Sequence, residues 1–190
     1  MRVQRDGMDD MKMSTGPDPA GRFTFRTIRQ DEAEQAAAIE AVCFPPNEAC
    51  KREHMLPRIA AASDFFWVAE DRQTGGIAGF INGIATDEDC FRDEFFTDAS
   101  IHDPDGKNIM ILGLDVLPEH RGRGLGRALA YSYAERESGR RLVLTCLDHL
   151  VGMYRKFGFR DLGQSASVWG GLRWHEMDRT ASCRKPDPAV

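Results

Sequence analysis

Residues 109–129, IMILGLDVLPEHRGRGLGRAL, constrain the fold most strongly, because signals for a strand, a glycine loop and a helix follow one another without a break. The segment 109–117 is apolar and contains β-branched residues, which predicts a central strand. Pro118 ends this strand because proline has no N–H to donate to a neighbour. A helix is expected to begin near Leu125, so the loop and the first turn of the helix can direct their N–H groups at one anion.

The loop itself, residues 119–126, has glycine at alternate positions from Gly122 to Gly126, which lets a ligand approach the backbone closely. A Walker loop needs Lys and Ser or Thr after its last glycine, but Arg127 and Ala128 stand there. A dinucleotide fingerprint fails as well, because its last glycine is missing in both possible registers. Two interpretations remain: a phosphate loop of another kind, or a connection that uses glycine only for tight turning.

The length of 190 residues suits a single domain. Residues 1–20 are polar and show no periodicity, so we expect a disordered leader. Residues 180–190 contain two prolines and are expected to form a flexible tail. The folded domain is therefore expected to span residues 21–179.

Composition excludes several classes of protein. The five cysteines are scattered and odd in number, which argues against a disulfide framework and a zinc site, so we expect no metal and a reduced, cytoplasmic location. A net charge of -5 with mixed signs argues against nucleic-acid binding. No apolar run approaches the roughly 20 residues of a membrane span. The sequence does not indicate an oligomeric state.

One strand and two helices are expected before residue 63. Alternating side chains at residues 23–27 predict the strand. Asp31 and Glu34 have the spacing of a capping box, which predicts a helix that ends before a Phe-Pro-Pro break. A second helix is expected over residues 47–62, interrupted or restarted by Pro57.

A hairpin is expected next, with strands at 65–70 and 77–85 joined by a double-glycine turn. Residues 86–106 are acidic and irregular, which predicts a loop with one short helical turn. Its three phenylalanines are expected to form a satellite cluster beneath the loop, with contact to a substrate or partner as the alternative; they are Phe91, Phe95 and Phe96.

The last third of the chain predicts alternating helices and strands. Apolar residues at helical spacing follow Leu125, and the apolar run 141–147 then predicts a buried strand parallel to the first, which makes a βαβ unit. A helix is expected over 148–157. Two final strands, near 159–165 and 167–177, are expected to form a closing hairpin.

Two motifs now agree. Arg121-x-x-Gly124-x-Gly126 lies between strand and helix, and Tyr154-Arg155-Lys156-Phe157-Gly158-Phe159 follows about thirty residues later. They resemble the pyrophosphate loop and the Y-x-x-F-G-F signature of the GCN5-related N-acetyltransferases (GNAT). The segments 39–49, 66–70, 79–83 and 144–146 are similar to the arylalkylamine N-acetyltransferase branch. This resemblance implies an α/β (α+β) mixed sheet with splayed central parallel strands and about four flanking helices.

The resemblance also implies acetyl-coenzyme A as co-substrate, with its pantetheine arm beside the strand and its pyrophosphate on residues 122–127. Loop amides and the helix dipole favour the negative charge there. We expect one or two of the three loop arginines to touch phosphate. The expected coenzyme-binding residues are Leu114, Asp115, Val116, Arg121, Gly122, Arg123, Gly124, Leu125, Gly126, Arg127 and Tyr154.

Tyr154 is the catalytic residue that the resemblance implies, because the family's tyrosine at this place protonates the departing thiolate. A phenol with a pKa of about 10 is protonated at neutral pH and suits that task. The alternative is a core aromatic on an apolar helix face.

The general base stays open. The branch carries two histidines on the central strand, and the aligned residues here are Met110 and Leu112, which cannot titrate. A water chain could end at His102 or Asp115, or the enzyme could capture the neutral fraction of the amine. His102 is expected to be exposed, and Asp115 has a structural role as its alternative.

An aromatic-amine pocket is implied by resemblance, with Phe44, Pro45, Pro46 and Trp174 as its cage and an apolar floor at Met110 and Leu112. The alternative is that Phe44 and Trp174 belong only to the core.

Three functions follow as hypotheses. The preferred one is an N-acetyltransferase that acetylates the primary amine of a small aryl-alkyl amine. The second keeps this chemistry with a polyamine, an amino acid or a protein amine as acceptor. The third is a non-catalytic acyl-coenzyme A-binding module, which the missing histidines suggest.

Overall fold

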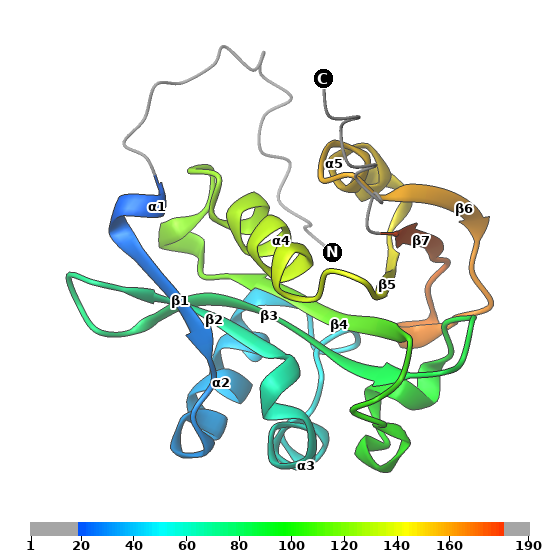
Figure 1. Ribbon diagram of the computed structural model, residues 1–190, viewed down its shortest axis with the longest axis horizontal. Helices are drawn as coiled ribbons and strands as arrows, with labels where there is room; N and C mark the ends of the chain where they lie inside the picture. The colour runs from blue at the N-terminus through cyan, green and yellow to red at the C-terminus, as the bar shows by residue number, and fades with distance from the viewer. Residues whose placement is uncertain (1–18, 181–190) are drawn as a thin grey trace, which may run out of the picture.

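One seven-stranded sheet runs through residues 19–180, the part of the chain that the computed structural model describes (Figure 1). Its strands are β1 (Phe23–Thr27), β2 (Phe66–Asp71), β3 (Ile77–Thr86), β4 (Asn108–Val116), β5 (Arg141–Cys146), β6 (Arg160–Gln164) and β7 (His175–Arg179). They lie in the order β1-β2-β3-β4-β5-β7-β6. Only β4 and β5 are parallel, and the other neighbours are antiparallel. The expected mixed sheet is confirmed.

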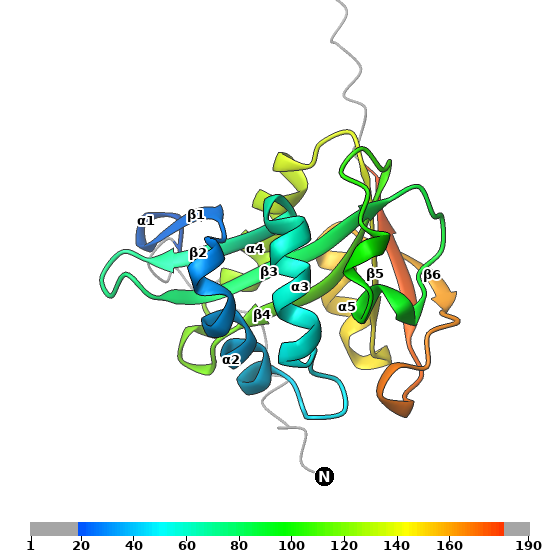
Figure 2. The ribbon, with the colours of Figure 1, turned by 90° about the horizontal axis from the view of Figure 1, so that it is seen from below.

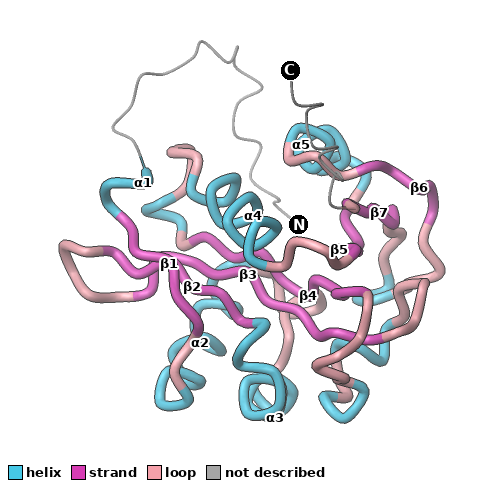
Figure 3. The backbone as a smooth tube through the Cα atoms, in the orientation of Figure 1, coloured by secondary structure: helices cyan, strands magenta, loops and turns pink. Residues whose placement is uncertain are grey.

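Helices cover both faces of this sheet. They are α1 (Pro19–Arg22), α2 (Ala33–Cys43), α3 (Arg52–Ala62), α4 (Leu125–Arg136) and α5 (Val151–Lys156). Figure 1 shows α4 and α5 on one side and α2 and α3 on the other, and Figure 2 looks onto α2 and α3 from below. The tube in Figure 3 gives the same layers by element type. The expected leader, residues 1–20, and the tail, 180–190, lie almost wholly outside the described residues.

Each face of the sheet has its own apolar core. Leu125, Leu129 and Tyr133 of α4 are buried on one side. On the other side, Ile39 of α2 and Met55 of α3 are buried. Full burial of a large apolar side chain contributes roughly 1.5–3 kcal/mol. The sheet is therefore held from both faces.

The central parallel strands pair only at their beginning. The register joins Asn108 with Arg141 and ends where Ile111 pairs with Leu144. Beyond this point β4 continues to Val116 without a partner on the β5 side. On its other side β4 stays paired with β3, although the register shifts once between Asn82 and Gly83. The expected βαβ unit and the splayed strands are therefore confirmed.

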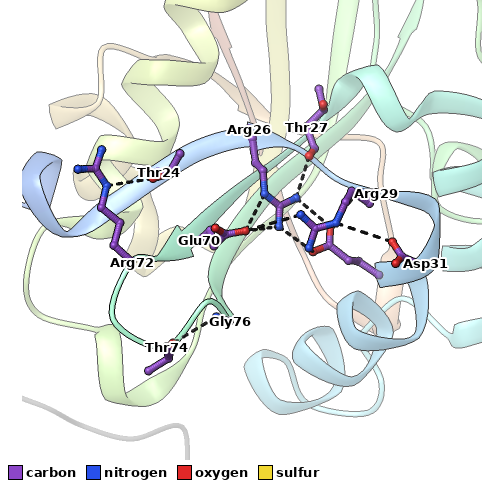
Figure 4. Close-up of polar contacts among 10 residues, drawn as sticks. Thr24, Arg26, Thr27, Arg29, Asp31, Glu70, Arg72, Thr74 and Gly76 are labelled. Carbon is purple, nitrogen blue, oxygen red and sulfur yellow. Dashed lines mark hydrogen bonds and ion pairs between the residues drawn. The ribbon is translucent and has the colours of Figure 1, made fainter.

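Arg26 of β1 fastens the edge of the sheet to the start of α2 (Figure 4). Its guanidinium donates to Glu70 at 2.6 and 2.8 Å and to Glu32 at 2.7 and 2.9 Å. Glu32 also accepts from the backbone N–H of Arg29 at 2.8 Å, which caps the short 3-10 turn before α2. The expected capping box of Asp31 and Glu34 is therefore wrong, because the capping contact joins Arg29 and Glu32. Glu34 instead pairs with Arg52 at the start of α3.

The second helix also differs from expectation. It begins at Arg52, because residues 46–49 form turns and a bend. Pro57 neither interrupts nor restarts it. Proline removes one helical hydrogen bond, and here it lies exposed while Met55, Arg58 and Ile59 of the same helix are buried. Packing of the buried face therefore outweighs the local propensity of proline.

The acidic segment between β3 and β4 is more structured than expected. It holds two 3-10 turns, Asp93–Phe96 and Ala99–Ile101, in place of one. Its phenylalanines belong to the main core and form no separate cluster; they are Phe91, Phe95 and Phe96. His102 is half-buried, against the expectation that it is exposed. Its Nδ1 accepts from the Ala85 N–H at 3.1 Å.

The two closing strands pair as expected, but their connection is long. β7 lies between β5 and β6, and a 3-10 turn, Trp169–Gly171, interrupts the segment between β6 and β7. The last strand begins at His175, so the expected strand over 167–177 starts too early. Trp174 consequently lies just before β7 in a loop.

Asp178 of β7 supports a prediction about stability. It is buried and accepts from Arg141 of β5 at 2.9 Å and from Arg160 of β6 at 2.9 and 3.0 Å. Burial alone would raise its pKa, but the two arginines outweigh burial and lower it. We expect Asp178→Asn to reduce the free energy of unfolding by about 2–3 kcal/mol, measured by urea denaturation, because two cations lose their partner.

The sign of the pH dependence follows from the lowered pKa. The carboxylate of Asp178 stabilises the fold above its unfolded pKa of about 3.9, and this contribution is lost as the pH falls through the lower folded value. The variant should therefore lose less stability than wild type in acid. Asp87→Asn is the control, because Asp87 is an exposed partner of Lys107 and should change stability by less than about 0.5 kcal/mol. Equal effects of both substitutions would show that the contacts of Asp178 with Arg141 and Arg160 do not stabilise the sheet.

Candidate active site

A cleft that is partly open to solvent lies where β4 and β5 diverge. Its walls come from both strands, from the loops after α2 and before β7, and from α5. The strand residues that line it are Ile111, Leu112, Gly113 and Leu114 of β4 and Leu144, Thr145 and Cys146 of β5. These residues are the last parallel pair, Ile111 and Leu144, and the residues that follow it. The cleft therefore exists because the two strands diverge there.

The unpaired edge of β4 borders this cleft. Leu114 lines it and is half-buried. The Val116 carbonyl accepts from Arg121 Nε at 2.8 Å and from Cys43 Sγ at 3.4 Å, so this acceptor is already used. Asp115 is fully buried and its carboxyl lies near Glu40 of α2, on the sheet face away from α4. Only its backbone is placed to meet a ligand at the strand edge.

The glycine loop joins β4 to α4 and is exposed. Gly122 and Gly124 adopt φ angles of 71° and 81°, in the left-handed region that favours glycine. Gly124 is the N-cap of α4, and its carbonyl accepts from the Ala128 N–H at 3.0 Å. Within residues 19–180, the N–H groups of residues 122–124 donate to no other backbone group, and the first N–H groups of α4 have no carbonyl one turn earlier in the helix to bond. These groups, at a helix N-terminus, fit a polyphosphate.

The three arginines of the loop have different surroundings. Arg121 is turned back onto the Val116 carbonyl. The Arg127 guanidinium lies 5.3 Å from the centre of the Tyr131 ring. Arg123 is exposed and makes no ion pair within the described part of the chain. Arg123 is therefore the arginine with most freedom to meet an anion.

Tyr154 of α5 lies in the cleft wall. Its ring packs edge-on against Phe157 and Phe159, with centroids 5.9 and 5.8 Å away. Its hydroxyl makes no hydrogen bond with any other described residue. Burial raises its pKa, and Cys146 and Asp115 raise it further. The phenol is therefore protonated at neutral pH and can donate its proton into the cleft.

An aromatic cage faces the cleft, with Phe44 and Trp174 in its lining as expected. Trp169 lines it too. The Trp169 ring stacks on Phe96 with centroids 4.6 Å apart and an interplanar angle of 28°. Two indole hydrogen bonds hold the cage: Trp169 Nε1 donates to the Glu48 carbonyl at 2.8 Å, and Trp174 Nε1 donates to the Trp169 carbonyl at 2.9 Å.

Other expected acceptor residues lie differently. Leu112 lines the cleft, but Met110 is fully buried in the main core and is not part of the lining. Pro45 and Pro46 are exposed and are also outside the lining. Contact of Met110 and Pro46 with a substrate stays a prediction.

Two carboxylates in the lining, Glu40 and Glu48, escaped the sequence reasoning. Glu48 is half-buried, and burial raises its pKa. Glu40 is 3% exposed, and burial raises its pKa as well. The signal for Glu40 was present, since it interrupts the helical stripe formed by Ala36, Ile39 and Cys43. Phe96, for which contact with a substrate was the alternative, lines the cleft, whereas Trp169 gave no comparable signal because a loop brings it there.

His102 does not reach this cleft. It borders a second hollow together with Ser63 and Asp64, at the end of α3. Burial lowers its pKa, and its Nδ1 already accepts a backbone hydrogen bond. Of the two ends considered for a water chain, only Asp115 lies near the cleft.

Comparison with known proteins identifies the family. The family model described as the acetyltransferase (GNAT) domain matches residues 62–161, which include β2 to β5, the glycine loop and Tyr154. The chain belongs to the GNAT acetyltransferases. The expected family is confirmed.

Two curated relatives support the expected branch. Serotonin N-acetyltransferase of Macaca mulatta is 32% identical over 170 residues, which cover 84% of this chain and 78% of that enzyme. Serotonin N-acetyltransferase of Mesocricetus auratus is 31% identical over 115 residues, which cover 58% of this chain and 54% of the enzyme. The chain thus spans only about half the length of the second relative.

The solved structures agree on the fold. The loading GNATL domain of CurA from Lyngbya majuscula superposes with a TM-score of 0.71 at 15% identity, covering 83% of this chain and 97% of that domain.

Among residues 19–180, no cluster of His, Cys, Asp and Glu could hold a metal ion. In the same range, every helix is too short or too polar to cross a bilayer.

Proposed function

We propose that the protein transfers the acetyl group of acetyl-coenzyme A to the primary amine of a small aryl-alkyl amine. The observation that carries this proposal is the cleft between β4 and β5, which combines the Tyr154 phenol with an aromatic cage. The relatives named serotonin N-acetyltransferase support the choice of acceptor.

The donor fits the exposed side of the site. Its pyrophosphate would lie on residues 122–127, where free N–H groups and the N-terminus of α4 favour negative charge. Its pantetheine arm would follow the unpaired edge of β4 at Leu114, Asp115 and Val116, toward Tyr154. The splay supplies the room that a pantetheine arm needs between two strands.

The chemistry needs a neutral amine, stabilisation of the oxyanion and a proton for the thiolate. The C–N bond forms at the acetyl carbon as the C–S bond breaks. The Tyr154 phenol gives its proton to the sulfur and regains one from the nitrogen that has been acetylated. Its raised pKa keeps this proton in place until the thiolate, a stronger base than the thioester, develops.

The acceptor would lie among the aromatic rings. Trp169 and Phe96 form a stacked wall, and Phe44 and Trp174 complete the apolar surface. An aryl ring buries well against such a surface. Glu48 at the same cleft offers a charge partner for an ammonium group.

A glycine pair tests where the coenzyme binds. Gly122 and Gly75 both have a φ of 71° and open space around the missing Cβ, so alanine imposes a similar backbone cost of roughly 1–2 kcal/mol at either position. We expect Gly122→Ala to raise the Kd of acetyl-coenzyme A at least tenfold by calorimetry, and Gly75→Ala to leave it within twofold. Equal affinities in the two variants would argue against the loop as the phosphate site.

A second pair tests Tyr154 as the acid. We expect Tyr154→Phe to lower kcat about 100-fold while the KM for acetyl-coenzyme A changes less than threefold, because only the proton transfer is lost. The matched control is Tyr131→Phe in α4, whose hydroxyl donates to the Lys156 carbonyl at 3.2 Å. If Tyr154→Phe keeps its kcat, the residue is an ordinary core aromatic.

The acceptor is tested with a panel of amines and a free-thiol readout. We expect kcat/KM for tryptamine, phenethylamine and tyramine to exceed the value for spermidine, lysine and an N-terminal peptide at least 100-fold, because only the aryl amines fill the aromatic cage. Preference for spermidine, lysine or the peptide would favour the second hypothesis. Coenzyme binding with no thiol release from any amine would favour the binding module.

A further inference from the structure

Four buried polar atoms in one place lack a hydrogen-bond partner. They are Glu40 Oε2 of α2, Asn82 Nδ2 of β3, and both carboxyl oxygens of Asp115 of β4. Leaving such a group unsatisfied costs about 1–3 kcal/mol. Glu40 and Asp115 can satisfy each other only if one of the two carboxyls is protonated and donates to the other, so the cluster points to a shared proton.

These atoms converge on Gly113. A Cβ at this position would lie 2.8 Å from Asn82 Nδ2, 3.0 Å from Asp115 Oδ2 and 3.5 Å from Glu40 Oε2. Any side chain larger than hydrogen would therefore fill the space that these three groups share. A donor and two acceptors around one small space match the partners that a buried water needs.

This space adjoins the cleft. Glu40 and Gly113 both line the cleft, while Asp115 lies behind them and is completely buried. Glu40 is therefore the carboxyl of the pair that the cleft can reach.

One positive charge supports the two carboxyls. Arg58 of α3 is buried, and it donates to the Asn82 Oδ1 at 3.0 Å and to the Phe96 carbonyl at 2.8 Å. Glu40 Oε1 accepts from the backbone N–H of Cys50 at 2.8 Å. The other titratable groups that interact with the pair are Cys43, Cys50 and Tyr154, and Arg121 acts on Cys43 beside them.

We propose that Glu40 is the proton acceptor of the acetyl-transfer reaction, and that Asp115 is a positioning residue that holds the resting proton of the pair. The inference rests on the proposed function, since it concerns the same cleft. Two buried carboxyls beside one arginine cannot both stay ionised, so they share one proton at rest. Glu40 accepts a backbone hydrogen bond that favours its ionised form, whereas Asp115 is completely buried and neither of its carboxyl oxygens has a donor, so the shared proton belongs on Asp115.

The protons then balance. The incoming ammonium loses one proton to Glu40, which leaves both carboxyls protonated and the amine neutral. The amine attacks the acetyl carbon, and its second proton reaches the sulfur by way of Tyr154. Glu40 afterwards returns its proton to water through the open cleft. The net products are the amide, the free thiol and one proton.

The test compares Glu40→Gln and Asp115→Asn with wild type on two acceptors. One is phenethylamine, and the other is a fluorinated phenethylamine whose ammonium is more acidic. We expect Glu40→Gln to lower kcat/KM for phenethylamine about 100-fold at pH 7, and the loss to shrink at least tenfold for the fluorinated amine and as the pH rises. A substitution that only disturbs packing would lower kcat/KM equally for both amines and at every pH. Asp115→Asn should shift the acid limb of the pH profile.

Glu32→Gln is the matched control, because Glu32 is a buried carboxylate far from the cleft, in the Arg26 network. It should lower the thermal midpoint and leave the pH profile unchanged. The proposal fails if Glu40→Gln folds and loses activity equally on both amines, or keeps the wild-type pH profile. If wild type acetylates no amine, both this proposal and the proposed function fail. If wild type is active and Glu40→Gln has the same activity as wild type, the role of Glu40 is overturned while the proposed function stands.

Discussion

The end of parallel pairing between β4 and β5 is the constraint on which the rest of the site depends. Ile111 and Leu144 form the last pair, and beyond them β4 keeps only its bonds to β3. The backbone N–H and C=O groups of an unpaired strand edge need hydrogen-bond partners when they lie inside a protein. Here Arg121 and Cys43 satisfy the Val116 carbonyl, and the remaining edge borders the cleft. The glycine loop lies directly after this edge, so the proposed acetyl donor can reach the cleft in which the amine would bind.

Sequence reasoning succeeded where local signals decide the structure. The strand that ends at Pro118, the glycine loop and the helix from Leu125 were predicted within one residue, because each depends on neighbours in the chain. The βαβ unit followed from an apolar run after a helix. It failed where tertiary packing decides. Pro57 lies inside a helix because the buried face of α3 holds it there, and Phe91 joins the main core through contacts distant in sequence.

The candidate site was predictable only in part for the same reason. Tyr154 and the glycine loop were found because they stand in motifs, and Phe44 and Trp174 because the resemblance pointed to them. Trp169 reaches the cleft through a long loop before β7, whose course no local pattern indicates. Glu40 is a middle case: its place in an apolar helical stripe is a signal for burial that the prediction did not use, and only the fold shows what it faces.

The polarity of the site also explains why two apolar residues can stand on the central strand. Met110 lies in the main core, so a titratable side chain there would have to be buried among apolar groups. The polar groups gather instead on the face that α2 and α3 cover, at Glu40, Asn82 and Asp115. Gly113 connects this cluster to the cleft, because its missing side chain leaves room between the carboxyls. In the proposed reaction Glu40 takes up the proton on this face, so a titratable group on the core face of β4 is unnecessary.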